Sequence, residues 1–121
     1  MKKEDKLTIG KGRTKVSLLA NRLGDDLVVF IYNEQAHIGA VAVGEYDHEH
    51  ERASVSVFTR LGHKDDVIAQ RAAYLISKSL HASVCVIAGI HVDNITGEEI
   101  KALGENASLA VEYFIKSIKG A

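Results

Sequence analysis

Residues 84–96, with the sequence VCVIAGIHVDNIT, combine a strand, a polar turn and a helix start. The stretch begins with a short apolar run rich in β-branched residues, which predicts a buried strand. The turn that follows holds Gly89, His91, Asp93 and Asn94. A strand that ends in a polar turn before a helix is where α/β proteins bind ligands. The rest of the predicted fold is therefore expected to be arranged around this turn.

A capping box starts the helix after the turn. Thr96 stands three residues before Glu99, so each side chain can accept a hydrogen bond from the backbone N–H of the other residue. Ile95 and Ile100 flank the box at the spacing of a hydrophobic staple. Apolar residues then recur at helical spacing and predict one core-facing side. These residues are Ile100, Leu103, Ala107, Val111, Phe114 and Ile118.

The segments before residue 84 predict a meander of strands followed by a helix. Apolar or alternating runs predict strands over Leu7–Ile9, Val16–Leu23, Leu27–Tyr32, His37–Gly44 and Ser54–Thr59. The charged segment Glu45–Arg52 predicts an exposed hairpin loop. A helix is expected to open within Gly62–Asp66 and to run to about Leu80. The predicted fold class is α+β: a mostly antiparallel sheet (meander) followed by helix-strand-helix, with two helices packed on one face of the sheet.

Composition and charge narrow the functions to consider. The 121 residues suit a single domain over residues 1–121, in which residues 1–6 are expected to fray. The formal net charge of −1 gives no electrostatic argument for binding nucleic acid or an anionic membrane. The sequence shows no bilayer-spanning apolar run and no signal peptide, so a cytoplasmic location is expected. Cys85 is the single cysteine and is expected to be a buried, inert thiol.

The strand order predicts that polar residues from distant segments meet at one edge of the sheet. A hairpin between the strands at His37 and Ser54 would bring His37 close to His63. The helix up to Leu80 is long enough to be the crossover to a parallel strand, which would bring His91 to the same edge. The Asn33–Gln35 turn is expected at this edge too, which collects Arg13, His37, His63, Lys64, His91, Asp93 and Asn94. The opposite edge is expected to collect Gly24–Asp26, His48, His50 and His81.

Histidines at the ends of separate strands could hold a metal ion, bind an anion or transfer a proton. The predicted metal ligands are His37, His63, His91 and Asp93. The alternative is that each histidine caps a strand or helix end and contacts water. The Gly62–Asp66 segment could bind phosphate through helix N–H groups and Lys64, unless Asp65 or Asp66 caps the helix. Gly10–Arg13 is a second candidate anion contact, with a flexible turn as its alternative.

Three segments resemble the signature segments of the LpdD-like prenylated-flavin chaperone domain family. They are residues 37–42 (HIGAVA), 62–66 (GHKDD) and 88–96 (AGIHVDNIT). The resemblance covers residues 13–118 and leaves the loop Glu45–Arg52 unmatched. It implies a fold like that of proteasome-assembly-chaperone domains, a sheet flanked by helices. It also implies binding of prenylated FMN and assistance in cofactor delivery or maturation of a UbiD-type (de)carboxylase, which would be the partner.

The resemblance and the predicted edge converge on one flavin site. The cofactor-binding residues are expected to be Arg13, His37, Gly39, His63, Lys64, Gly89, His91 and Asn94. Arg13 and Lys64 would attract the phosphate of FMN or prenylated FMN. The histidines and Asn94 would contact polar edges of the ring or a bridging divalent metal ion. The two glycines would let a planar ring approach the backbone, because neither has a Cβ.

The sequence shows no nucleophile–base pair, so a non-catalytic binding protein is expected rather than an enzyme. Two other classes remain open: a metal-dependent small enzyme that uses the histidines with Asp93 as base, and a ligand-free assembly scaffold. A homo-oligomer is also expected. A flat sheet edge encloses a flavin only partly, and a second copy is a low-cost way to complete the walls of the site.

Overall fold

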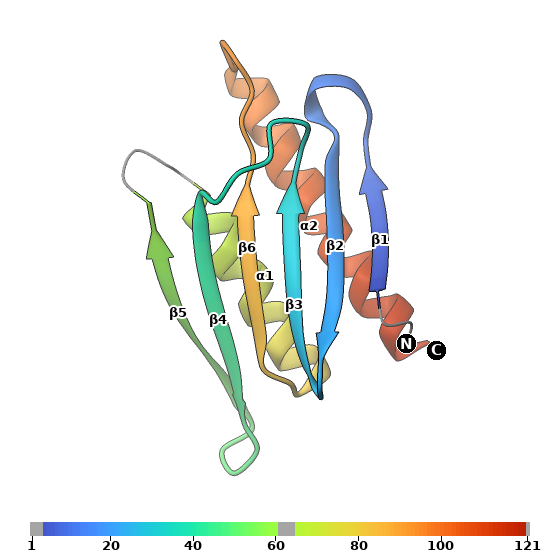
Figure 1. Cartoon of the computed structure of the whole chain (residues 1–121), viewed down its shortest axis with the longest axis vertical. Helices are drawn as coiled ribbons and strands as arrows, with labels where there is room; N and C mark the ends of the chain where they lie inside the picture. Colours follow the sequence, from blue (N-terminus) through green and yellow to red (C-terminus); the bar gives the residue numbers. More distant parts are fainter. Residues whose placement is uncertain (1–3, 61–64, 121) are drawn as a thin grey trace.

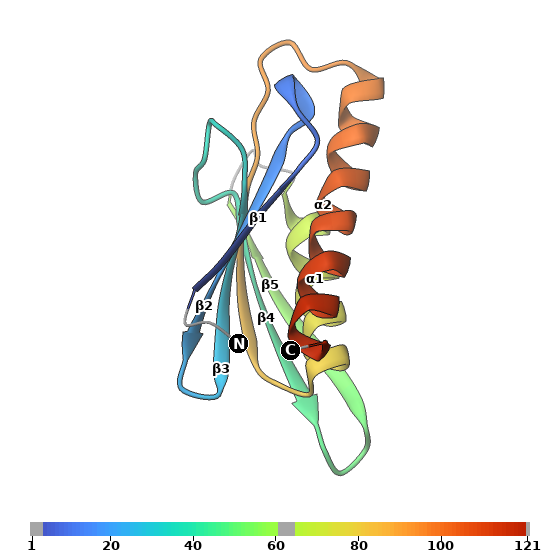
Figure 2. The ribbon, with the colours of Figure 1, turned by 90° about the vertical axis from the view of Figure 1, so that its right-hand side faces the viewer.

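Two helices cover one face of a six-stranded sheet in residues 4–60 and 65–120, the part of the chain that the computed structural model describes (Figures 1 and 2). The helices are α1 (Asp66–Leu80) and α2 (Gly97–Lys119), and a short 3-10 turn is η1 (Gly12–Thr14). The strands are β1 (Glu4–Ile9), β2 (Val16–Leu23), β3 (Asp26–Tyr32), β4 (Ala40–Asp47), β5 (Arg52–Thr59) and β6 (Val84–Gly89). The predicted α+β class, with both helices on one face, is confirmed.

β6 lies between β3 and β4, so the sheet order is β1-β2-β3-β6-β4-β5 rather than a continuous meander. β6 pairs parallel with β3 and antiparallel with β4. Both β3 and β6 are almost entirely apolar, which is the pattern of strands in the interior of a sheet. The predicted hairpin of β4 and β5 is confirmed. The predicted common direction of β5 and β6 is also confirmed, because both run antiparallel to β4.

The ends of β4 differ from the prediction. The strand was expected over His37–Gly44 but spans Ala40–Asp47, because residues 37–39 belong to the connection that crosses the end of β6. The predicted loop Glu45–Arg52 shrinks to a turn over residues 48–51, since its flanks continue the β4–β5 ladder. Tyr46 stacks on His81 with ring centroids 4.1 Å apart. This long-range contact supports a strand where the local composition predicts a loop.

The core lies between the helices and the sheet and is built mostly of aliphatic side chains around Phe114. Small residues bring α1 close to the sheet: a Cβ on Gly44 would lie 2.6 Å from the Ala73 carbonyl oxygen. Ile100 was expected on the core side of α2 but is 58% exposed. Cys85 was expected to be buried but is partly exposed. Its neighbours in β6, Val84 and Val86, point into the core, so Cys85 points to the other face of the sheet.

The predicted capping box is present at the start of α2. The Thr96 hydroxyl accepts a hydrogen bond from the Glu99 N–H at 3.1 Å, and the Glu99 carboxylate accepts one from the Thr96 N–H at 3.0 Å. We expect Thr96→Ala to lower the free energy of unfolding by about 1 kcal/mol, because a helix N–H loses its acceptor. Thr96→Ser, which keeps the hydroxyl, is the control. Urea unfolding with equal midpoints for the two variants would contradict this cap.

Substitution of two glycines by alanine is expected to change stability in opposite directions. A Cβ on Gly89 would collide with the backbone oxygen of His37, whereas a Cβ on Gly104 would meet no described atom within 4 Å apart from the adjacent residues and backbone of its own helix. Gly89→Ala is expected to lower the free energy of unfolding by about 1–3 kcal/mol or more, as overpacking does. Gly104→Ala, inside α2, is expected to raise it by up to about 1 kcal/mol through helix propensity. Chemical denaturation of both variants checks the prediction, which fails if both change stability in the same direction.

Candidate functional site

Several connecting segments meet at the edge of the sheet where β3 and β6 end, at the top of Figure 1. We define this polar edge as residues 10–15, residues 33–39, residues 90–96 and Asp65, at the start of α1. His37 and His91 both belong to it, as the strand directions predicted. His63 and Lys64 lie outside the described residues. The predicted sharing of one pocket by His37, His63 and His91 therefore stays a prediction.

Residues 33–39 cross over the end of β6 to reach β4. The Gly39 N–H donates to the Ala88 carbonyl at 2.9 Å, and the His37 backbone lies against Gly89 where a side chain would otherwise be. In the same way, the missing side chain of Gly39 leaves room for the Asp65 carboxylate. Both glycines therefore make room for the chain itself. Their predicted contact with a flavin ring stays a prediction.

Asn33 ties this crossing segment to the turn after β6. Its Nδ2 donates to the His91 carbonyl at 2.8 Å, and its Oδ1 accepts from the N–H groups of His91 at 3.3 Å and Gln35 at 3.2 Å. A side-chain amide has both a donor and an acceptor, so it can satisfy both backbone groups of His91. The sequence analysis placed the Asn33–Gln35 turn at this edge but gave the Asn33 side chain no role. Its position directly after β3, beside the turn that follows a parallel strand, was the available signal.

His91 and Asp93 form an exposed pair within the turn. The His91 Nε2 donates to Asp93 Oδ1 at 2.9 Å, and the two side chains are 55% and 72% exposed. The hydrogen bond from His91 lowers the pKa of Asp93 below its ordinary value, and the charge of His91 and a bond from Gln35 act in the same direction. Asp93 is therefore an ionised acceptor at neutral pH. Asn94 follows it, exposed and in the left-handed region with φ of 52°.

Arg13 was expected to bind phosphate, but its guanidinium is occupied by partners from the chain itself. Its Nε and one terminal nitrogen donate to the two Glu99 carboxylate oxygens at 2.6 and 3.2 Å. The same terminal nitrogen donates to the Asp93 carbonyl at 2.7 Å. These bonds connect the β1–β2 segment to the first turn of α2. The hydrogen bond from Arg13, with one from the Thr96 backbone, lowers the pKa of Glu99 to about 2.

A cleft of about 230 Å³ lies among these segments. Its lining residues are Gly12, Arg13, Lys15, Asn33, Glu34, Gln35, His91, Val92 and Asp93. The cations that line it already face carboxylates: Arg13 faces Glu99, and the Lys15 amine lies 3.3 Å from Glu34. Among the described residues, the cleft thus carries no excess positive charge. Its chemistry is that of a hydrogen-bonding site with side chains of both donor and acceptor type.

His37 and Asp65 form a second pair, which is more buried. The His37 Nδ1 donates to the Gln35 carbonyl at 2.9 Å, and its Nε2 lies 3.5 Å from Asp65 Oδ2. The other Asp65 oxygen accepts from the Ile90 N–H at 3.1 Å. Asp65 occupies the N-cap position of α1, yet among the described residues its side chain caps no helix N–H. Its carboxylate links α1 to the end of β6 instead, a role that the sequence prediction missed.

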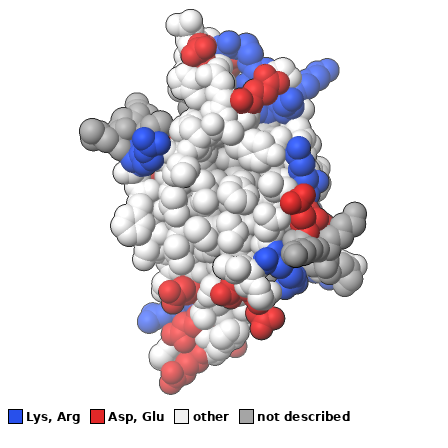
Figure 3. All heavy atoms as spheres, viewed as in Figure 1, with Lys and Arg blue, Asp and Glu red and all other residues white. Residues whose placement is uncertain are grey.

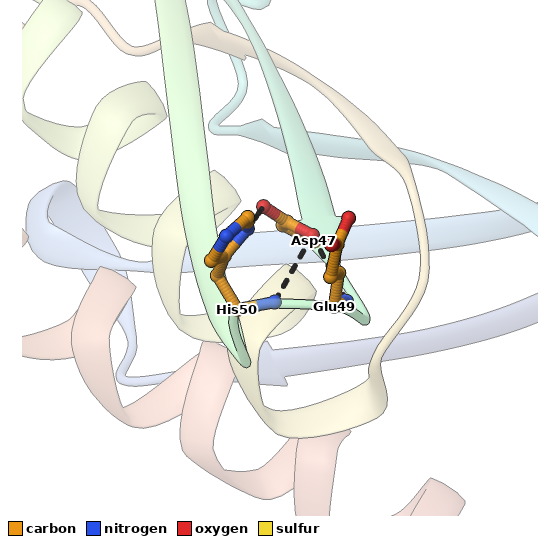
Figure 4. A group of neighbouring side chains, drawn as sticks. All are labelled: Asp47, Glu49 and His50. Carbon is orange, nitrogen blue, oxygen red and sulfur yellow. Dashed lines mark hydrogen bonds and ion pairs between the residues drawn. The ribbon is translucent and has the colours of Figure 1, made fainter.

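The opposite edge collects His48, His50 and His81, as predicted. There Asp47, Glu49 and His50 each offer one ligand atom, and these atoms lie within 4.8 Å of one another (Figure 4). The His50 Nδ1 donates to Asp47 Oδ2 at 2.8 Å, while Asp47 Oδ1 accepts from the backbone N–H groups of Glu49 and His50. These bonds are those of a side chain that closes a turn. The cluster is therefore explained by the β4–β5 turn, and the predicted metal set at the polar edge stays a prediction.

A larger groove of about 590 Å³ lies between α1 and α2, away from the polar edge. Apolar residues such as Val67 and Leu75 line it together with charged ones such as Arg71 and Glu112. None of the predicted site residues that the structure describes lines this groove. Within residues 4–60 and 65–120, no helix is both long and apolar enough to cross a membrane.

Comparisons with known proteins agree with the resemblance noted in the sequence. The family model described as "Prenylated flavin chaperone LpdD-like domain" matches residues 10–119. Among solved structures, the fold is similar to a chain from the "Crystal Structure of a Novel Chaperone Complex for Yeast 20S Proteasome Assembly", with a TM-score of 0.61, 13% identity and 98% of each chain covered. At that identity the likeness shows the fold alone. No curated protein matches the chain.

The Arg13–Glu99 pair predicts a measurable pKa change. Arg13→Gln is expected to raise the pKa of Glu99 from about 2 toward the ordinary value of 4.5, because the strongest hydrogen bond to the carboxylate is lost. Carboxyl-carbon NMR titration measures this directly, with Lys15→Gln as the control that leaves Glu99 unchanged. A Glu99 pKa that stays at about 2 without the arginine would contradict the assignment.

The Arg13–Glu99 pair also predicts how the stability of the protein changes as the pH falls. A carboxyl whose folded pKa is depressed contributes stability above its unfolded pKa and loses it as the pH falls through its folded pKa. For wild type, the Glu99 contribution is therefore lost between about pH 4.5 and pH 2. Arg13→Gln should show less loss of stability than wild type across this window in acid unfolding experiments.

Proposed function

Because this chain belongs to the prenylated flavin chaperone LpdD-like domain family, we propose that it binds prenylated FMN and assists the loading or maturation of a UbiD-type (de)carboxylase. The family match over residues 10–119 is the observation that carries this proposal. The described parts of the polar edge lie within the matched range. The proposed role is non-catalytic: the protein holds the cofactor and passes it on.

The cleft at the polar edge fits one end of a flavin. The edge of an isoalloxazine ring carries both N–H and C=O groups, which need acceptors and donors. Asp93 is an ionised acceptor, and Gln35 and His91 also line the cleft. The volume of about 230 Å³ is below the roughly 300–1,000 Å³ of pockets that enclose a small-molecule ligand. The described cleft therefore suits a polar edge of the ring rather than the whole cofactor.

The phosphate of the cofactor needs positive charge or free N–H groups. Arg13 and Lys15 already face carboxylates in the cleft. We therefore assign the phosphate to Lys64 and the start of α1, as the sequence predicts, or to a divalent cation that bridges it to Asp93. Magnesium binds in this way, through one or two carboxylates and the phosphate of its ligand. His37, His63 and Asn94 remain the proposed contacts beside it.

The small size of the cleft also supports a homo-oligomer in this proposal. Good ligand sites bury most of the ligand surface, and a cleft that holds only one end of a flavin leaves the remainder exposed. A second copy of the chain would supply further walls, most simply through two-fold symmetry.

Flavin binding tests the proposal directly. We expect wild type to bind prenylated FMN in a fluorescence titration, with FMN as the comparison ligand and Mg²⁺ either supplied or chelated. His91→Ala is expected to weaken binding by roughly tenfold, the effect of losing one hydrogen bond to a ligand. His50→Ala is the matched control, because His50 is 60% exposed and donates to an aspartate in the same way, but at the opposite edge. Lys64→Ala is also expected to weaken binding, more strongly at low salt.

Two results would decide against the proposal. Equal affinities of wild type, His91→Ala and Lys64→Ala would contradict the site assignment. A wild-type protein that binds no prenylated FMN, with divalent cations supplied, would contradict the function and favour a ligand-free assembly scaffold.

A further inference from the structure

The two outer strands of the sheet differ in how their free edges are protected. β1 and β5 each pair on one side only, with β2 and β4, and β5 forms the left margin of the sheet in Figure 1. An outer strand presents unpaired N–H and C=O groups to other chains, and charged side chains, Pro or bulges usually block that pairing. β1 begins with Glu4, Asp5 and Lys6. β5, with the sequence RASVSVFT, carries a single charge, at Arg52, its first residue.

The backbone of β5 is regular along its whole length. It pairs with β4 without interruption from Arg52 to Thr59, so no bulge turns this edge away. The Arg60 N–H donates to the Gly39 carbonyl at 3.0 Å and continues the ladder, which means that the even-numbered residues of β5 bond to β4. The N–H and C=O groups of residues 53, 55, 57 and 59 therefore point outward. The eight residues of β5 give this edge a length of roughly 26 Å.

Apolar side chains lie beside this edge on both faces of the sheet. Val55 and Val57 pack against the core but stay partly exposed, because β5 is the outermost strand. On the other face, Phe58 is 73% exposed. In Figure 3, which has the view of Figure 1, the left margin of the molecule is free of Lys, Arg, Asp and Glu between its upper and lower ends. A strand added here would bury these apolar side chains through cross-strand contacts.

α1 extends the apolar surroundings of the edge. It packs on β4, β5 and β6, whereas α2 packs on β1 and β2. Ala72 lines the groove between the two helices, and Tyr74 lies about 200° further round α1, on the side away from α2. That side faces the free edge, since β5 is the outermost strand beneath α1. Tyr74 is 39% exposed and would contact the side chains of an added strand.

Arg60 gives a positive charge to the end of β5 that adjoins the polar edge. Its side chain is exposed, and its Nη1 donates to the Ile38 carbonyl at 2.9 Å. Within residues 4–60 and 65–120, no carboxylate forms an ion pair with it. An acidic residue of a bound segment would be favoured at this place. A second copy of the chain supplies none, because two-fold pairing along all of β5 would place Arg52 opposite Arg60 at both ends, where like charges repel.

We propose that the free edge of β5 binds an extended segment of the (de)carboxylase that receives the cofactor, as a seventh strand antiparallel to β5. In this mode of recognition, main-chain hydrogen bonds supply affinity and alternate side chains supply specificity. The segment alternates apolar residues with small or polar ones, and an acidic residue precedes them beside Arg60. The identity of the occupant rests on the proposed function, whereas the open edge itself does not.

The place of β5 in the fold suits the transfer of a cofactor. Arg60 donates hydrogen bonds to the carbonyls of Ile38 and Gly39, which belong to the segment 33–39 of the polar edge. A strand bound along β5 therefore begins beside this segment. No residue of β5 lines the cleft at the polar edge, so the recipient enzyme would be held next to the cleft without filling it.

Hydrogen exchange of individual backbone amides tests the proposal. The probe is the purified, cofactor-free UbiD-type (de)carboxylase encoded by the same genome. In the free chain, the amides of residues 53, 55, 57 and 59 should exchange quickly and those of residues 54, 56 and 58 slowly, because only the even-numbered ones donate to β4. A saturating amount of the enzyme is expected to slow the odd-numbered amides by about tenfold or more and to leave the even-numbered ones unchanged.

Two variants separate the backbone contact from the charge, with affinity for the enzyme measured by calorimetry. Thr59→Pro removes one outward N–H and is expected to weaken binding by roughly tenfold, the effect of one lost hydrogen bond. Thr59→Ala keeps the N–H and is the matched control. Arg60→Glu should also weaken binding, more strongly at low salt. Arg22→Glu is its control, because Arg22 is equally exposed but lies near the end of β2.

Three outcomes would overturn the proposal. An enzyme that does not bind the chain removes the occupant. An enzyme that binds while the odd-numbered amides still exchange quickly, or that binds Thr59→Pro and Arg60→Glu as it binds wild type, docks elsewhere. Odd-numbered amides that become protected in the free chain as its concentration rises would assign the edge to a second copy. A chain that binds the enzyme along β5 but binds no prenylated FMN would keep this docking site and contradict only the cofactor binding of the proposed function.

Discussion

The passage of residues 33–39 over the end of β6 is the contact on which the polar edge depends. Because β6 is inserted between β3 and β4, the chain must bridge two strand spacings, about 10 Å, before it can pair again. It does so directly above the end of β6, where Gly89 leaves room for the His37 backbone. The same crossing brings Asn33 to His91 and His37 to Asp65. The side chains of the site are thus positioned by the topology of the sheet.

Two carboxylates stabilise the polar edge because each of them connects two elements of the fold. Glu99 completes the capping box of α2 and also pairs with Arg13 from the β1–β2 segment. Asp65 stands at the start of α1 and accepts a hydrogen bond from the end of β6. Glu99 thereby neutralises Arg13, a cation that the sequence suggested for the phosphate of the cofactor. The cleft is therefore better suited to the polar edge of a ring than to a phosphate without a bridging cation.

The central strands serve both faces of the sheet. Val29, Ile31, Val84 and Val86 fill the core beneath the helices, while Val28, Phe30, Cys85 and Ile87 lie on the opposite face of the sheet. The cleft at the polar edge is small, which suits the proposed role of a protein that passes its ligand on.

Short-range patterns in the sequence were sufficient to predict much of the fold. The Thr96–Glu99 box, the bounds of β2 and the first helix follow from hydrogen bonds and side-chain periodicity within a few residues. The common edge of His37 and His91 was also predictable, because it depends on strand directions and not on which strands are neighbours. The sequence also carried the family resemblance, which the match of the family model over residues 10–119 confirms.

Only the tertiary structure decided the order of the strands and the partners of the charged groups. The place of β6, the pairing of Arg13 with Glu99 and the link from Asp65 to Ile90 each join residues far apart in the chain. The end of β4 beside His81 and the exposure of Cys85 depend on the same packing. Such contacts are set by how whole elements fit together, and no local pattern encodes them. The sequence by itself therefore determined the elements and their directions, and the packing of those elements determined the site.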